Sequence, residues 1–171
     1  MIRKFNLLLA ATSLVGFGFA IPALALDHAV GVGKSCPTAT KVGDLATCTL
    51  RVSNEDEFGD SLTVNGLYDL VDGTLRVPDV GNLPITSVDA GVTCAPAPVS
   101  ESAPLGLVFP CLIPGVAQEG GSGLEVRTTS TYTVPAGATD PLLDQANAAV
   151  QDSCNVSPIG CNPTEQDQQF G

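Results

Sequence analysis

Two long segments of the chain alternate apolar or small side chains with polar ones, residue by residue. In residues 46–52, the alternating apolar positions are Ala46, Cys48, Leu50 and Val52. In residues 124–134, one side carries Leu124, Val126, Thr128, Ser130, Tyr132 and Val134, and the other carries Glu125, Arg127 and three threonines. A period of two is typical of a β-strand with one buried face. Each segment is therefore predicted to be a strand.

Shorter strand candidates lie between these two segments. They are residues 62–68, 70–71, 75–77, 85–88 and 105–113. The dipeptide Asp72-Gly73 separates two of them and is typical of a tight hairpin. Short strands divided by Gly, Pro, Asn and Asp at intervals of roughly 8 to 12 residues favour an antiparallel β-sandwich over a parallel sheet with crossover helices. The fold class predicted from the pattern is all-β.

Two regions depart from the regular spacing. Residues 96–114 contain five prolines, which favour extended or edge structure, so we expect a long irregular excursion there. After Asp140-Pro141, the spacing of the apolar residues in 142–150 is that of a short helix with a cap and a first-turn proline. A strand is the alternative for this region, because residues 140–142 and 147–150 also resemble the strands of a known repeat domain.

The first 25 residues have the three parts of a secretory signal peptide. Arg3 and Lys4 form a basic start, residues 7–20 form an uncharged apolar run, and residues 23–25 are Ala-Leu-Ala. The apolar run is shorter than the roughly 20 residues that a membrane-spanning helix needs. We therefore expect cleavage after Ala25 and a secreted, periplasmic or cell-surface protein.

Cleavage would leave one domain of ordinary size. We expect a single β-sandwich domain over residues 26–161 and a polar, loosely ordered tail over residues 162–171. Loss of Arg3 and Lys4 changes the net charge from −11 to −13, with 18 acidic side chains against five basic ones. This balance disfavours nucleic acid as a partner.

Residues 42–54, which read V-G-D-L-A-T-C-T-L-R-V-S-N, resemble the start of a known repeat domain. That domain is an immunoglobulin-like repeat of unknown function in bacterial surface and adhesin-like proteins, with the pattern V-G-D-x-V-x-Y-x-I-x-V-x-N. Residues 131–134, 140–142 and 147–150 resemble its closing strands. The resemblance implies an immunoglobulin-like sandwich at the cell surface, with no known catalytic residues and no cofactor.

All six cysteines lie in the predicted mature chain, which suits an oxidising compartment and an even number of disulfide partners. Six cysteines allow fifteen pairings. Because short loops close most easily, the favoured pairs are Cys36 with Cys48, Cys94 with Cys111, and Cys154 with Cys161.

Catalytic and metal motifs are weak in this sequence. The single histidine, His28, is close to the predicted new N-terminus, which is a poor place for an ordered catalytic base. Residues 31–35, Gly-Val-Gly-Lys-Ser, match only part of a phosphate-binding loop, because His28 replaces the first glycine. We expect that segment to be a flexible lead into the first strand. The cysteine spacings do not suit a zinc site, and no catalytic or metal site is predicted.

The acidic cluster at residues 54–60 offers one further possibility. Asn54, Asp56 and Gly59 match the first, third and sixth places of a calcium-binding loop, but Phe58 stands where an oxygen ligand is expected and Asn65 where a bidentate acidic residue is expected. A solvated acidic surface is the simpler interpretation, and calcium binding stays open.

The sequence thus predicts a non-catalytic structural or interaction module, acting in adhesion, envelope assembly or subunit assembly through a protein partner or a second copy. The alternative is a small secreted hydrolase or enzyme inhibitor on the same scaffold.

Overall fold

The computed structural model describes residues 29–36, 41–56, 59–98, 103–115 and 123–154, together with the backbone of residues 166–170. This part of the chain forms ten strands and no helix. The strands are β1 (Val30–Ser35), β2 (Leu45–Asn54), β3 (Leu62–Val71), β4 (Leu75–Val77), β5 (Ile85–Val88), β6 (Thr93–Pro96), β7 (Leu107–Ile113), β8 (Glu125–Thr133), β9 (Asp144–Asp152) and β10 (Gln166–Phe170).

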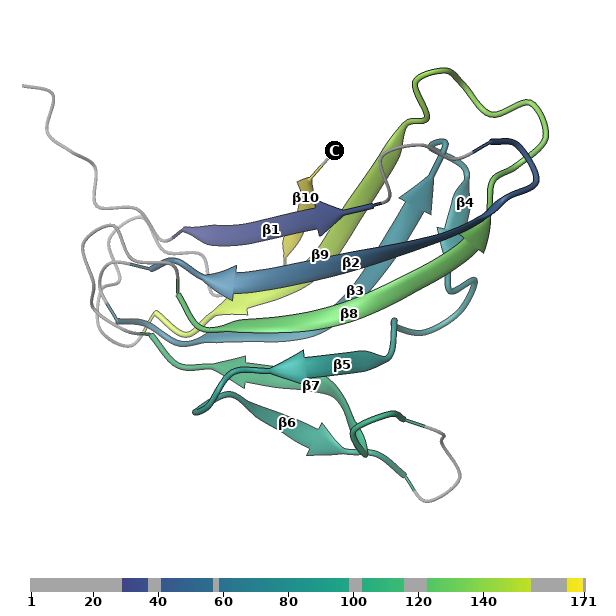
Figure 1. Cartoon of the computed structure of the whole chain (residues 1–171). Coiled ribbons are helices and arrows are strands. Elements are labelled where there is room, and N and C mark those ends of the chain that lie inside the picture. The colour runs from purple at the N-terminus through teal and green to yellow at the C-terminus, as the bar shows by residue number, and fades with distance from the viewer. Residues whose placement is uncertain are drawn as a thin grey trace, which may run out of the picture.

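The strands form two antiparallel sheets. The first sheet has the order β1-β2-β8-β5, and the second has the order β10-β9-β3-β7-β6, with β4 paired to β3. Figure 1 shows the sheets as two layers, with β2 and β8 running across β9 and β3. Their inner faces share one core, so the fold is the all-β antiparallel sandwich that the sequence predicts.

The core comes from alternate positions of the central strands of both sheets. The pattern predicted for β2 and β8 is confirmed, because their inner residues are buried and the intervening threonines and arginines are exposed or half-buried. The largest fully buried apolar side chains are Leu50, Leu67, Ile85, Ile113, Val52, Val64, Val71 and Val126. None of these is aromatic, so the core is filled mainly by branched aliphatic residues.

Leu50 and Leu45 offer a matched test of this core, because both lie on β2 but are 0% and 69% exposed. Leu50→Ala should lower the free energy of unfolding by about 2–5 kcal/mol, since it removes methyl groups and leaves a cavity. Leu45→Ala should change it by less than about 0.5 kcal/mol. Urea unfolding of the two variants tests this, and equal losses would mean that β2 does not have the predicted orientation.

The Pro-rich region contains one of the predicted strands. The candidate at residues 105–113 is confirmed as β7, which pairs with β6, the outermost strand of its sheet, although residues 96–114 were also expected to form a long irregular excursion. The edge structure predicted for this region is confirmed too. An edge strand leaves backbone groups unpaired on one side, so the proline at the end of β6 costs no ladder hydrogen bond there.

Residues 144–152 form strand β9, not a helix. The helical spacing was misleading because β9 pairs with β3 on one side and β10 on the other, and Ala146, Ala148 and Val150 all face the core at a period of two. Residues 166–170, predicted to belong to a loosely ordered tail, form β10 alongside β9. The domain boundaries and the remaining tail residues stay predictions.

Two of the three favoured disulfides are confirmed. Cys36 is bonded to Cys48, twelve residues away, and Cys94 is bonded to Cys111, seventeen residues away. The second disulfide joins directly opposed residues of β6 and β7. Cys154 is also disulfide-bonded, whereas Cys161 lies outside the described residues.

The predicted signal peptide, residues 1–25, also lies outside the described residues. In the part of the chain that is described, no helix has the length and apolar character needed to cross a membrane.

Candidate functional site

Lys34 lies inside the sandwich, although it belongs to an edge strand. The segment around it was predicted to be a flexible lead, which is wrong because residues 30–35 pair with β2 as strand β1. In that pairing Lys34 is opposite Leu50, and directly opposed residues of an antiparallel pair share one face. Since Leu50 is fully buried, the Lys34 side chain also points into the core and is only 5% exposed.

Two aspartates of the second sheet meet this lysine. Asp69 stands in the inward row of β3 between Leu67 and Val71, and its side chain is completely buried. Asp144 is the first residue of β9, opposite Val71, and its side chain is 12% exposed. The alternation that brings apolar side chains into the core therefore brings both carboxylates to the interface between the sheets.

The lysine amine contacts both carboxylates. Lys34 Nζ forms ion pairs with Asp69 Oδ1 and with Asp144 Oδ1. Burial raises the pKa of Asp69, and its contacts with Lys34 and Ser130 oppose this rise while Asp144 adds to it. One cation thus faces two acids in a largely apolar space, and Asp69 is the acid that binds a proton more readily than usual.

Tyr132 completes the cluster from the first sheet. Its hydroxyl donates a hydrogen bond of 2.5 Å to Asp144 Oδ2, and its ring centroid lies 5.8 Å from Lys34 Nζ. The pKa of Tyr132 is raised well above its ordinary value of 10, first by burial and then by Asp144 and Asp69. We call Lys34, Asp69, Tyr132 and Asp144 the inter-sheet charge cluster.

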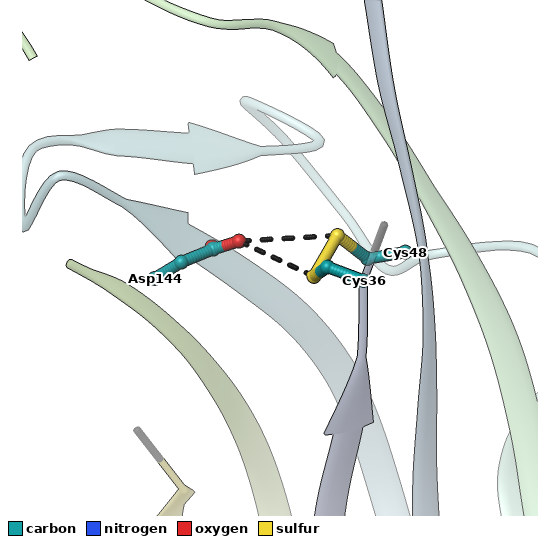
Figure 2. A group of neighbouring side chains, drawn as sticks. All are labelled: Cys36, Cys48 and Asp144. Carbon is teal, nitrogen blue, oxygen red and sulfur yellow. Dashed lines mark hydrogen bonds between the residues drawn. A yellow bond between two sulfur atoms is a disulfide. The ribbon is translucent and has the colours of Figure 1, made fainter. Parts of the chain in front are cut away.

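The first disulfide borders this cluster. Asp144 Oδ2 lies 3.6 Å from Cys36 Sγ and 3.9 Å from Cys48 Sγ, and Figure 2 shows the carboxylate directed at the S–S bond. Cys48 Sγ is also 3.8 Å from the Tyr132 hydroxyl oxygen. Oxidised sulfurs carry no hydrogen, so they contact Asp144 without donating a hydrogen bond to it. They are not thiolates either, so this group of side chains is unsuited to binding a metal.

The raised pKa of Tyr132 gives a direct spectroscopic prediction. A folded-state pKa above the unfolded value of 10 means that stability contributed by this group is lost as pH rises beyond 10. Tyr68→Phe leaves Tyr132 as the sole tyrosine, because the chain has two tyrosines and no tryptophan. In this variant, phenolate absorbance should develop at higher pH in the native protein than in the same protein unfolded in urea. Coincident titrations would contradict the buried hydrogen bond to Asp144.

A second acidic group lies at the other end of β2. Carboxylate oxygens of Asp56, Asp60 and Asp152 lie within 4.8 Å of one another. The Asp60 backbone N–H donates to Asp56 Oδ2 at 2.6 Å, and Ser153 donates to Asp60 Oδ1 at 3.1 Å. Carboxylates in this arrangement could hold a hard cation such as calcium.

This group differs from the calcium loop considered from the sequence. The Asn54 amide N–H group donates to the backbone oxygens of Asp60 and Ile113, and its Oδ1 accepts from the Asp56 N–H. Asn54 therefore fixes the loop instead of offering a ligand. Phe58 lies outside the described residues, and Asn65 lies within β3.

The outer face of the first sheet carries an exposed ion-pair group. Glu125 is the first residue of β8, and its side chain is buried. It forms ion pairs with the partly exposed Arg127 and, at 3.5 Å, Arg51. Together with Thr49 these residues line part of a depression of about 480 Å³ that opens beside β1. Because both arginines are about half exposed, the pairs contribute little to stability.

The candidate residues from the sequence thus have mixed outcomes. In the structure, Cys36 is bonded to Cys48 and Cys94 to Cys111. His28 and Cys161 lie outside the described residues. Sequence reasoning missed the inter-sheet charge cluster. The sequence feature that could have revealed it is Asp69, an acidic residue at a position where the alternation of β3 calls for an apolar, inward-facing residue.

No protein-family model, curated protein or solved structure matches this chain.

Proposed function

We propose that the protein is a secreted or cell-surface structural module with an immunoglobulin-like sandwich, acting without catalysis in adhesion, envelope assembly or subunit assembly. The observation that carries this proposal is the location of the inter-sheet charge cluster. Its charged side chains are between 0% and 12% exposed, so they face one another across the core instead of an open cleft. Side chains placed this way hold two sheets together.

The order β1-β2-β8-β5 supports the immunoglobulin-like part of the proposal. In such sandwiches, one sheet has the order A-B-E-D, and the facing sheet contains C, F and G. Here β1, β2, β8 and β5 correspond to A, B, E and D, while β3, β9 and β10 correspond to C, F and G. The β6–β7 hairpin is an addition beside β3.

The outer face of the first sheet is the surface we assign to partner contact. Thr47 is opposite Thr131, and Thr49 is opposite Thr129, in the central pair of strands β2 and β8. The edge strands β5 and β6 are short, and proline precedes β5 and ends β6, which disfavours pairing with a further strand. A partner is therefore expected to contact the threonine face and not the sheet edges formed by β5 and β6.

Binding of the exported protein to intact cells and isolated envelopes tests this proposal. The double variant Thr49→Lys/Thr131→Lys should lose binding at least about tenfold, which corresponds to about 1.4 kcal/mol. Val80→Lys is the matched control, because Val80 is 88% exposed and lies in the connection between β4 and β5, outside the two strands of this face. Equal binding of both variants would exclude the threonine face. A protein that binds neither cells, envelopes nor itself, and that instead cleaves glycans or esters or inhibits proteases, would favour the hydrolase or inhibitor alternative.

A further inference from the structure

The inter-sheet charge cluster raises a question of energetics. A buried ion cluster often stabilises a protein no more than apolar side chains of the same volume, because each charge loses its hydration. In this cluster, two carboxylates, those of Asp69 and Asp144, contact the single primary amine of Lys34. An amine and two carboxylic groups are the reactants and the proton carrier that a condensation to an amide needs.

We propose that Lys34 and Asp144 become joined by an intramolecular amide bond, which links strand β1 of one sheet to strand β9 of the other. Lys34 Nζ contacts Asp144 Oδ1, so the nitrogen lies next to the carboxyl carbon that it attacks. Asp69 Oδ1 contacts the same nitrogen. The bond does not depend on any partner of the protein.

The reaction balances without a further reagent. The Nζ–Cγ bond forms, one Cγ–O bond of Asp144 breaks, and that oxygen leaves as water. The Lys34 ammonium loses two protons, both of which depart in the water, and the positive and negative charges of the reactants cancel. Asp69 accepts a proton from Nζ and passes it to the leaving oxygen, and its raised pKa suits this role.

Asp144 is the acceptor and Asp69 the proton carrier because their surroundings differ. The Tyr132 hydroxyl donates to Asp144 Oδ2 at 2.5 Å, where it stabilises the negative charge that develops on oxygen during attack. Asp144 is also 12% exposed, which gives the water a way out, whereas Asp69 is fully enclosed. Lys34 is thus the nucleophile and Asp69 the proton carrier of a single self-modifying reaction, and Tyr132 stabilises its intermediate.

The sequence makes this bond easy to detect. After removal of the predicted signal peptide, Lys34 and Lys41 are the only lysines, and no lysine or arginine follows Arg127. Trypsin does not cleave after an acylated lysine. The reduced, alkylated protein should therefore give a branched product in which residues 26–41 are joined to residues 128–171, lighter than the two peptides by one water.

Mass spectrometry of the exported, unfolded and reduced protein tests the proposal. Free peptides 26–34 and 35–41 would show that Lys34 is unmodified and would overturn it. Linkage to residues 52–76 would overturn it too, because that peptide contains Asp69. Loss of ammonia instead of water would also contradict it, since the acceptor would then be an amide such as Asn147, which lies in the same peptide as Asp144.

Two variants separate the roles of the residues. Asp69→Asn keeps the shape of the side chain but removes the proton carrier, so the linked product should be lost or formed at least tenfold more slowly. Lys41→Arg is the matched control, because Lys41 is exposed, and it should leave the linked product intact. Persistence of the product at the wild-type rate in Asp69→Asn would exclude the proposed role of Asp69.

Discussion

Replacing Lys34 by methionine should lower the free energy of unfolding by about 3–5 kcal/mol or more. The methionine has a similar length but no charge, so Asp69 and Asp144 would face each other in the core without a counter-charge. Removing one partner of a buried ion pair is costly because the remaining charge is still deprived of water. Loss of the proposed amide bond would add to this effect.

Urea unfolding with the disulfides intact measures this loss. Lys41→Met is the control, because Lys41 is exposed and its replacement should change the free energy of unfolding by less than about 0.5 kcal/mol. If Lys34→Met were as stable as Lys41→Met, the lysine would not be paired inside the sandwich. If Lys34→Met were not exported in folded form, Lys34→Arg, which retains the charge but lacks the nucleophilic amine, would provide the comparison.

Removing the Cys94–Cys111 disulfide should lower the free energy of unfolding by about 3 kcal/mol. The bond closes a loop of seventeen residues and holds the β6–β7 hairpin, which is attached to the rest of its sheet through β7 alone. Without the bond, the unfolded chain gains freedom, and the outermost strand can separate from its neighbour.

The double variant Cys94→Ala/Cys111→Ala allows this loss to be measured by urea unfolding. Exchange of backbone amide hydrogens provides a second readout, because protection should fall in β6 and β7 but not in β2 and β8. A uniform loss of protection in all strands would show that the bond stabilises the whole sandwich and not this hairpin. A stability loss below about 1 kcal/mol would contradict the structural role itself.

The strands with one buried and one exposed face were predictable from the sequence. In β2 and β8, Leu50 and Val126 alternate with exposed arginines, so the period of two is visible. In β9 the same period was hidden, because residues 146–149 read Ala-Asn-Ala-Ala and Asn147 is buried like its neighbours. Because alanine or a buried asparagine fills both inward and outward positions here, the alternation was not visible, and the apolar spacing resembled that of a helix.

The disulfides were predictable because short loops close most easily, and two pairs followed that rule. The inter-sheet charge cluster was not predictable in this way. Lys34, Asp69 and Asp144 are far apart in the chain, and only the pairing of β1 with β2 and of β3 with β9 directs them to one point. Their charges alone suggested solvent exposure, since lysine and aspartate are rarely buried unless paired.

The central claim is that Lys34 joins the two sheets from inside the sandwich. A crystal structure of the exported protein at atomic resolution tests this claim most directly. The account predicts that Lys34 Nζ lies between Asp69 and Asp144, with continuous electron density from Nζ to the carboxyl carbon of Asp144. A Lys34 side chain extended into solvent, with Asp69 and Asp144 separated by apolar side chains, would contradict it.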